Sequence, residues 1–229
     1  MKRIIYFVLA ILVCGIYAGC SESEIELYNQ TSRINFYGSL HIRTLVDTDY
    51  VKKDDPYAID SFTVKIQGDL LKENRDFCVK VSPNSDYQKS VDVLLESKYT
   101  YTELDTVCQV FYYKIKRPAV EAGRKVYGCF LEFDLSNPLH QFDKGLVEQN
   151  QIPLNVRWEL KTDEWGCWSG YKYGSYSDEK YMFIMDVCGC VYEELEEEDY
   201  DKVKQAYKEY REAGNPPILG EDGDEIVYE

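Results

Sequence analysis

The stretch Cys129-Phe130-Leu131-Glu132-Phe133-Asp134-Leu135 decides the fold class of this chain, because every second residue from Cys129 is apolar and two residues between them are acidic. Such alternation is typical of a β-strand with one face on a core and the other in water. The pattern recurs at residues 62–66, 77–81 and 111–115, each followed closely by a glycine or proline. With weaker candidates at 34–37 and 42–46, these short strands predict an antiparallel β-sandwich over residues 33–137.

The chain changes character after Pro138. Residues 154–160 still alternate as a strand, but residues 165–176 are rich in glycine and aromatic side chains and predict an irregular loop. Together with the helices that follow, this predicts a smaller α+β region over residues 138–229.

Two helices are predicted in that region. Ser177 suits an N-cap and Gly189 a stop, which indicates a helix from Asp178 to about Cys188; the alternation at 181–187 leaves a strand as the alternative. Apolar and tyrosine residues at helical spacing between Glu196 and Ala213 predict a second, amphipathic helix that packs its tyrosines on the domain. Residues 219–227 form a final hairpin or a loose end.

The N-terminus has the features of an export signal that ends at a cysteine. Basic residues 2–3 precede an apolar run at 4–17, and Ala18-Gly19 stands directly before Cys20. Small residues before a cysteine suit lipoprotein processing, so we predict a signal peptide at 1–19, lipidation of Cys20 and an acidic tether over 20–32. An ordinary secretory signal or an uncleaved anchor is the alternative.

Composition limits the partners. The formal net charge of the chain is −15 at pH 7, which disfavours nucleic acid. Beyond the signal, no apolar stretch approaches the length of a transmembrane helix, so the lipid is the predicted membrane attachment. Six cysteines follow Cys20 and could form disulfides in an exported protein, but Cys78 and Cys129 also suit buried free thiols.

Taken together, the lipobox, a sandwich of this length, the tryptophan strand, the run 174–181 and the C-terminal Gly-Asp turn resemble an uncharacterised family of Bacteroidetes outer-membrane lipoproteins, a domain of unknown function. The resemblance implies an immunoglobulin-like or Calx-β-like sandwich with a C-terminal extension. Genes of the family tend to lie beside uptake systems of the starch-utilisation type. It therefore implies a cell-surface location and a role near nutrient capture.

Aromatic side chains in and near the 165–176 loop are the strongest candidates for a ligand site. Planar rings with polar edges stack on the apolar faces of sugars, which predicts glycan binding. Burial of the rings between the sandwich and the helices, or a protein contact, are the alternatives. The candidate residues are Trp158, Trp165, Trp168, Tyr171, Tyr173 and Tyr176.

Other chemistry has weak support in the sequence. Acidic clusters at 47–49, 54–55 and 221–224 could hold Ca²⁺ but lack EF-hand spacing, and His41 and His140 stand in unrelated contexts. No phosphate-binding glycine motif occurs, so we predict no cofactor or metal. The sequence predicts a non-enzymatic surface lipoprotein that binds a glycan or an uptake complex; a structural, assembly or adhesion protein is the alternative, and an uncharacterised hydrolase is a third.

Overall fold

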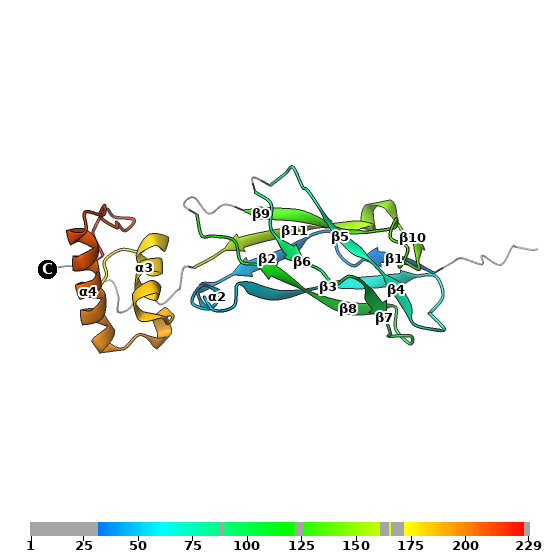
Figure 1. Ribbon diagram of the computed structural model, residues 1–229, viewed down its shortest axis with the longest axis horizontal. Helices are drawn as coiled ribbons and strands as arrows, with labels where there is room; N and C mark the ends of the chain where they lie inside the picture. The colour runs from blue at the N-terminus through cyan, green and yellow to red at the C-terminus, as the bar shows by residue number, and fades with distance from the viewer. Residues whose placement is uncertain (1–31, 88, 122–125, 161–164, 166–171, 227–229) are drawn as a thin grey trace, which may run out of the picture.

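The computed structural model describes residues 32–87, 89–121, 126–160, 165 and 172–226 (Figure 1). A β-sandwich makes up most of the length of the molecule, and two helices lie at one end of it. The predicted signal peptide, Cys20 and nearly all of the tether lie outside the described residues. None of the helices in the described part is long and apolar enough to cross a membrane.

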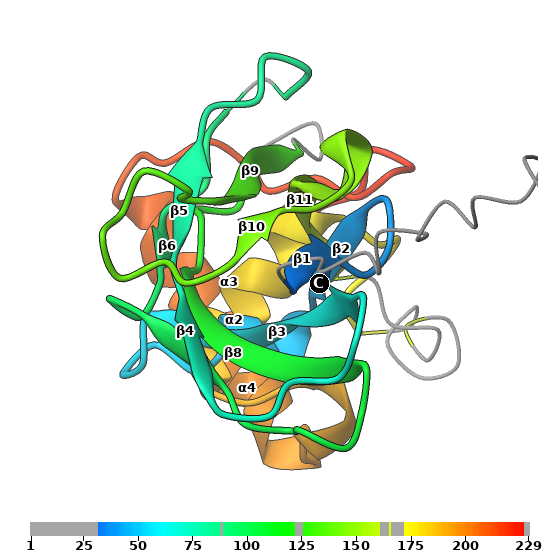
Figure 2. The same cartoon turned by 90° about the vertical axis from the view of Figure 1, so that its right-hand side faces the viewer.

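Two sheets form the sandwich, and Figure 2 shows them nearly end-on, with β9 and β11 above β3 and β8. One sheet has the order β10 (Asp143–Lys144), β1 (Arg33–Phe36), β3 (Tyr57–Gln67), β8 (Cys108–Lys116) and β6 (Val93–Leu94). The other has the order β2 (His41–Leu45), β11 (Gln151–Trp158), β9 (Tyr127–Phe133) and β5 (Val79–Ser82). A short ribbon pairs β4 (Arg75–Phe77) with β7 (Tyr99–Tyr101).

Most strand pairs are antiparallel, as in the prediction, but two pairs at sheet edges are parallel. These are β1 with β10 and β2 with β11. Parallel neighbours need a long connection, and more than 90 residues separate β2 from β11 along the chain. The mainly β prediction is confirmed, whereas the wholly antiparallel one is wrong at these edges.

The sandwich core forms from the inward residues of the alternating segments. Phe36 of β1 stacks on Phe133 of β9 with ring centroids 4.2 Å apart, which joins the two sheets. Phe62 packs edge-on against Phe36 at 5.4 Å. Cys129, Leu131 and Phe133 are buried, and Glu132 lies opposite Lys80 of β5 on the outer face, so the period of two holds through β9. Leu135, which the pattern also placed on the core face, lies beyond the strand and is 40% exposed.

The predicted end of the sandwich at Asn137 is wrong. Strand β11 pairs with β9 on one side and β2 on the other, so it is an inner strand of the second sheet. The alternation at 154–160 was evident in the sequence, but its partner β2 lies far away along the chain. The sandwich therefore extends to Trp158.

The segment for which the sequence allowed a helix or a strand forms a helix, α3 (Asp178–Cys188). The Ser177 hydroxyl accepts a hydrogen bond from Lys180 N at 3.1 Å, and Gly189 adopts a left-handed φ of 74° at the other end. These are the usual signals for the start and stop of a helix, and they prevail over the strand-like alternation.

The predicted amphipathic helix is confirmed as α4 (Glu197–Glu212), which buries Val203 and Tyr207. Tyr207 meets Phe183 of α3 edge-on at 5.8 Å, so the tyrosine stripe packs inside the protein. In the described part of the tail, residues 219–226, an antiparallel bridge joins Leu219 and Glu225, and no strand is present. Other helical segments among the described residues are α2 (Asp47–Tyr50), η1 (Val147–Gln149) and η4 (Tyr192–Glu194).

Candidate functional site

Three of the predicted glycan-binding rings lie in the interior. Trp165, Tyr173 and Tyr176 are only 5%, 4% and 6% exposed, within a second hydrophobic core formed with α3 and α4. The Trp165 ring meets Tyr176 edge-on, with centroids 5.1 Å apart. Rings enclosed in this way present no face to a sugar, so the alternative of burial holds for these three. Trp168 and Tyr171 lie outside the described residues.

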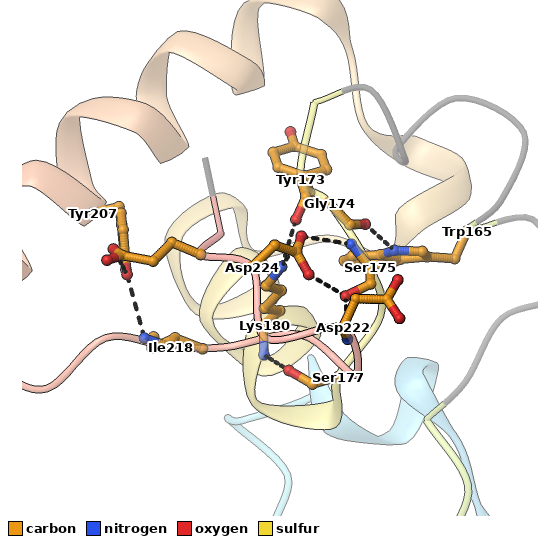
Figure 3. Close-up of polar contacts among 11 residues, drawn as sticks. Trp165, Tyr173, Gly174, Ser175, Ser177, Lys180, Tyr207, Ile218, Asp222 and Asp224 are labelled. Carbon is orange, nitrogen blue, oxygen red and sulfur yellow. Dashed lines mark hydrogen bonds and ion pairs between the residues drawn. The ribbon is translucent and has the colours of Figure 1, made fainter. Parts of the chain in front are cut away.

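A polar network beneath these rings holds the loop and the tail together (Figure 3). Lys180 is fully buried, and its Nζ donates to the carbonyl oxygen of Tyr173 at 2.9 Å and pairs with Asp224 Oδ2 at 3.0 Å. The same oxygen of Asp224 accepts a hydrogen bond from Ser175 N at 2.8 Å. A buried ammonium group with these partners is compensated in charge and hydrogen bonding, so the network is structural.

The backbone conformation and the surroundings of residue 174 explain why a glycine stands there, in the loop before α3. Its φ is +74°, and a Cβ there would collide with Asp224 Oδ2. A side chain at this position would therefore break the network as well as strain the backbone. Trp165 Nε1 donates to the carbonyl oxygen of Gly174 at 3.0 Å, which fixes the turn against the buried indole.

Trp158 is the predicted ring that lies beside a pocket. The pocket has a volume of about 200 Å³ and lies where the chain between β2 and β3, the end of β8 and the end of β11 come together. In Figure 1 this is the end of the sandwich that faces α3. Its lining includes Tyr50, Lys52, Lys116, Arg117 and Trp158.

Local contacts position the two rings of this junction pocket. Trp158 Nε1 donates to the carbonyl oxygen of Pro118 at 2.9 Å, and its ring meets Tyr50 edge-on at 6.1 Å. The hydroxyl of Tyr50 donates to Asp186 of α3 at 3.1 Å. Burial, then the charge and hydrogen bond of Asp186, raise the pKa of Tyr50, so its phenol stays protonated at physiological pH. Both rings remain partly accessible.

Positive charge gathers around the junction pocket. Asp49 is buried and faces two guanidinium groups, with Arg43 Nη2 and Arg117 Nη2 each 3.6 Å from one of its oxygens. Lys52 and Lys116 are exposed at the rim. Lys53 is paired with Asp186 at 2.5 Å. The pocket can therefore offer aromatic edges and cationic hydrogen-bond donors to a small polar ligand.

Sequence reasoning missed Tyr50, Asp49 and Arg117 as pocket residues. The available signal was the pair of basic dipeptides at 52–53 and 116–117 in an otherwise acidic chain. These dipeptides are 64 residues apart, and the pairing of β3 with β8 brings them together.

A second pocket, of about 370 Å³, is lined by Glu73, Asn74, Arg75 and Gln141. It offers no aromatic side chain for a sugar ring to stack on. The junction pocket is therefore the stronger candidate for glycan binding.

The acidic clusters considered for Ca²⁺ make contacts with the protein itself. Asp47 accepts a hydrogen bond from the Tyr181 hydroxyl at 2.9 Å, Asp49 faces two arginines, and Asp224 pairs with Lys180. Within the described ranges, no group of three or more histidine, cysteine or acidic residues has a geometry suited to a metal ion.

The two histidines have separate partners. His41 Nε2 lies 2.9 Å from Asp60 Oδ2, whereas His140 Nδ1 accepts a hydrogen bond from Cys78 N at 3.2 Å. Burial lowers the pKa of His140, which favours the neutral ring. Neither hydrogen bond joins the ring to a hydroxyl or a thiol.

The cysteines in the described part of the chain are unpaired: Cys78, Cys108, Cys129, Cys188 and Cys190. Burial raises the pKa of both Cys129 and Cys188 to about 12, which keeps these thiols protonated and unreactive. Cys167 lies outside the described residues, so its pairing stays a prediction.

Comparison with known proteins gives a weak structural likeness. No family model and no curated protein matches the chain. Among solved structures, the apo form of the Calx CBD1 domain is similar, with 8% identity and a TM-score of 0.37 over 57% of this chain and 99% of that domain. The lipoprotein family expected from the sequence remains a prediction.

Proposed function

We propose that this protein is a non-enzymatic surface lipoprotein that binds a glycan, alone or as an accessory of an uptake complex. Cys20 is its proposed lipid attachment to the outer membrane, with the folded part facing the cell exterior. The junction pocket is its proposed glycan site. The finer fold assignment, an immunoglobulin-like or Calx-β-like sandwich, belongs to the same proposal and draws support from the two facing, mainly antiparallel sheets.

One observation carries the proposal: the junction pocket combines two partly accessible aromatic rings with charged side chains. Sugar sites typically pair an aromatic edge or face with a few fixed polar groups. Tyr50 and Trp158 supply the rings, and their hydrogen bonds to Asp186 and Pro118 fix their orientation. Arg117, Lys52 and Lys116 supply donors for hydroxyl or acidic oxygens.

A blocked pocket gives a direct test. Ala119 is exposed and lines the pocket, so Ala119→Trp fills it without removing a core side chain. Ala213 is exposed after α4 and outside the pocket lining, which makes Ala213→Trp the matched control. We expect the protein to bind members of a host and dietary glycan panel, Ala119→Trp to weaken binding about tenfold or more, and Ala213→Trp to leave it unchanged. No binding, or binding indifferent to Ala119→Trp, would overturn the proposal.

An assembly or adhesion role is a second candidate, favoured by an apolar outer sheet face. Ile59 of β3 and Tyr112 of β8 are 63% and 65% exposed, and Val110 and Leu94 are exposed on the same side of adjacent strands. Exposed apolar side chains gathered on one face are typical of protein contacts.

Pull-down from solubilised outer membranes tests this second candidate. We expect an assembly protein to co-purify with a transporter, and the double variant Ile59→Lys/Tyr112→Lys to lose that partner. Lys65→Glu, at another exposed position of β3, is a control for an altered charge on the sheet. Recovery of the protein alone would contradict the assembly role.

A further inference from the structure

We infer that the junction pocket selects a sugar bearing an oxyanion, a carboxylate or a sulfate; this rests on the proposed glycan-binding function. The inference concerns the charge of the ligand. It follows from an excess of cations in the pocket wall, one unpaired buried donor, and the contrast with the rest of the surface.

The lining of the junction pocket holds more positive than negative charge. The single carboxylate of Asp49 lies between the guanidinium groups of Arg43 and Arg117, at 3.6 Å from each. The side chains of Asp49 and Arg117 are both only 11% exposed. Arg43 stands outside the pocket lining and is 32% exposed. The lining itself has four basic side chains, Lys52, Lys53, Lys116 and Arg117, against the carboxylates of Asp49 and Asp55, so it keeps a net positive charge that an incoming anion would neutralise.

Arg117 also has an unused donor. Its Nη groups contact Asp49 and the carbonyl oxygens of Lys52 and Asp55, but its buried Nε–H has no acceptor among the described residues. A buried donor without an acceptor is costly. Guanidinium groups bind carboxylates and sulfates through N–H donors, and Arg117 lines the pocket, so its guanidinium group is a chemically suitable partner for an oxyanion.

The exposed side chains at the mouth of the pocket also favour an anionic ligand. Lys52 has no side-chain partner among the described contacts, and Lys116 lies 4.0 Å from the exposed Asp92. Exposed ammonium groups at the mouth of a pocket attract an anion and repel other cations. In a chain with a net charge of −15, this concentration of basic side chains departs from the general character of the molecule.

The size of the pocket limits the ligand. Its volume of about 200 Å³ is below the roughly 300–1,000 Å³ typical of sites that enclose a drug-sized molecule. One sugar ring, or the charged end of a longer chain, is therefore the expected occupant. The remainder of an oligosaccharide would lie outside.

The test compares three oligosaccharides of one linkage that end in glucuronate, in a sulfated glucose or in plain glucose, by isothermal titration with the full-length protein. We expect either anionic ligand to bind about tenfold or more tightly than the neutral one. Raising the salt from about 0.1 M to about 1 M, which shortens the Debye length from roughly 10 Å to roughly 3 Å, should reduce this preference.

Variants that remove charge test whether the pocket is the source of the preference for anionic oligosaccharides. Lys52→Gln/Lys116→Gln retains long polar side chains but removes both rim charges, and it should lose the preference for anions. Lys65→Gln/Lys114→Gln removes two exposed lysines of β3 and β8 outside the pocket lining and should retain it. Both double variants change the net charge equally, so a general electrostatic effect would act on both.

The outcomes separate the inference from the proposed function. Equal or tighter binding of the neutral oligosaccharide overturns the inference and leaves glycan binding intact. An equal loss in both double variants overturns the pocket as the source of selectivity. Binding of the sulfate but not the carboxylate supports the inference and identifies the group. Failure of all three oligosaccharides and of a broad glycan panel overturns both proposals.

Discussion

Asp60 is a carboxylate of β3 whose charge is stabilised by its neighbours. Its side chain is 11% exposed, lies 2.9 Å from His41 Nε2, and accepts hydrogen bonds from Ser61 N and the Tyr113 hydroxyl. Burial acts to raise the pKa of Asp60, but the hydrogen bond and charge of His41, with the other two donors, together hold it below its ordinary value. The stability of the sandwich is therefore expected to depend on the ionisation of Asp60, and hence on pH.

This link predicts an acid-dependent loss of stability. A carboxylate with a lowered folded-state pKa stabilises the protein above its unfolded pKa, and the contribution disappears as pH falls through the folded value. We expect Asp60→Asn to lower the free energy of unfolding at pH 7 by roughly 1–3 kcal/mol, measured by urea denaturation. The difference from the parent protein should shrink as the pH falls below about 4.

Asp92→Asn is the control for Asp60→Asn, since its carboxylate is 79% exposed and 4.0 Å from Lys116. It should change stability little at either pH. A gap between Asp60→Asn and the parent that stays constant down to pH 3 would contradict the assignment.

At the scale of elements, the C-terminal tail is held to α3 by the ion pair of Lys180 and Asp224. The Lys180 side chain is fully buried, and that of Asp224 is 17% exposed. Because Ser175 also binds Asp224, the tail, the loop before α3 and the first turn of α3 depend on one carboxylate. The pair is therefore a tertiary link between segments 44 residues apart.

Removing only the anion of this pair should destabilise the protein more than removing both charges. Asp224→Asn leaves the Lys180 ammonium buried without its anion, and we expect a loss of about 3–5 kcal/mol in urea unfolding followed by helical circular dichroism. Lys180→Met/Asp224→Asn should be more stable than Asp224→Asn, since it leaves no uncompensated charge. A double variant no more stable than Asp224→Asn would argue against the buried ion pair.

The type of each element, helix or strand, was easier to predict from the sequence than the pairing of the strands. Ser177 and Gly189 are local signals, and they identified α3 against a competing alternation. Strand β11 pairs with β9 as well as with distant β2, so the change in composition after Pro138 falls inside the sandwich and does not mark its end. Local patterns indicate the type of an element, whereas strand pairing across long separations requires the whole chain.

The candidate site was harder to predict for a related reason. Aromatic side chains suit a core as well as a ligand surface, and no local pattern distinguished buried Trp165 from partly accessible Trp158. The basic residues of the junction pocket come from separate segments that only the folded sandwich brings together. Residue types thus predicted the chemistry of the site better than its place.

For the whole molecule, Trp158 matters because it contacts two hydrophobic cores. One core fills the sandwich and the other lies among α3, α4 and the tail, and Trp158 packs at the border of both. Polar contacts cross the same border, from Tyr181 to Asp47 and from Tyr50 to Asp186. The indole is therefore expected to couple the unfolding of the two parts.

Calorimetry can measure this coupling. We expect the parent protein to unfold in one transition and Trp158→Ala to show two, because the loss of the ring separates the cores. Trp158→Phe keeps an apolar ring at the border and loses the hydrogen bond to Pro118, which at about 1 kcal/mol should lower Tm by about 2–4 °C without a second transition. If Trp158→Ala still unfolds in one transition, the polar contacts between Tyr181 and Asp47 and between Tyr50 and Asp186 suffice to couple the two cores.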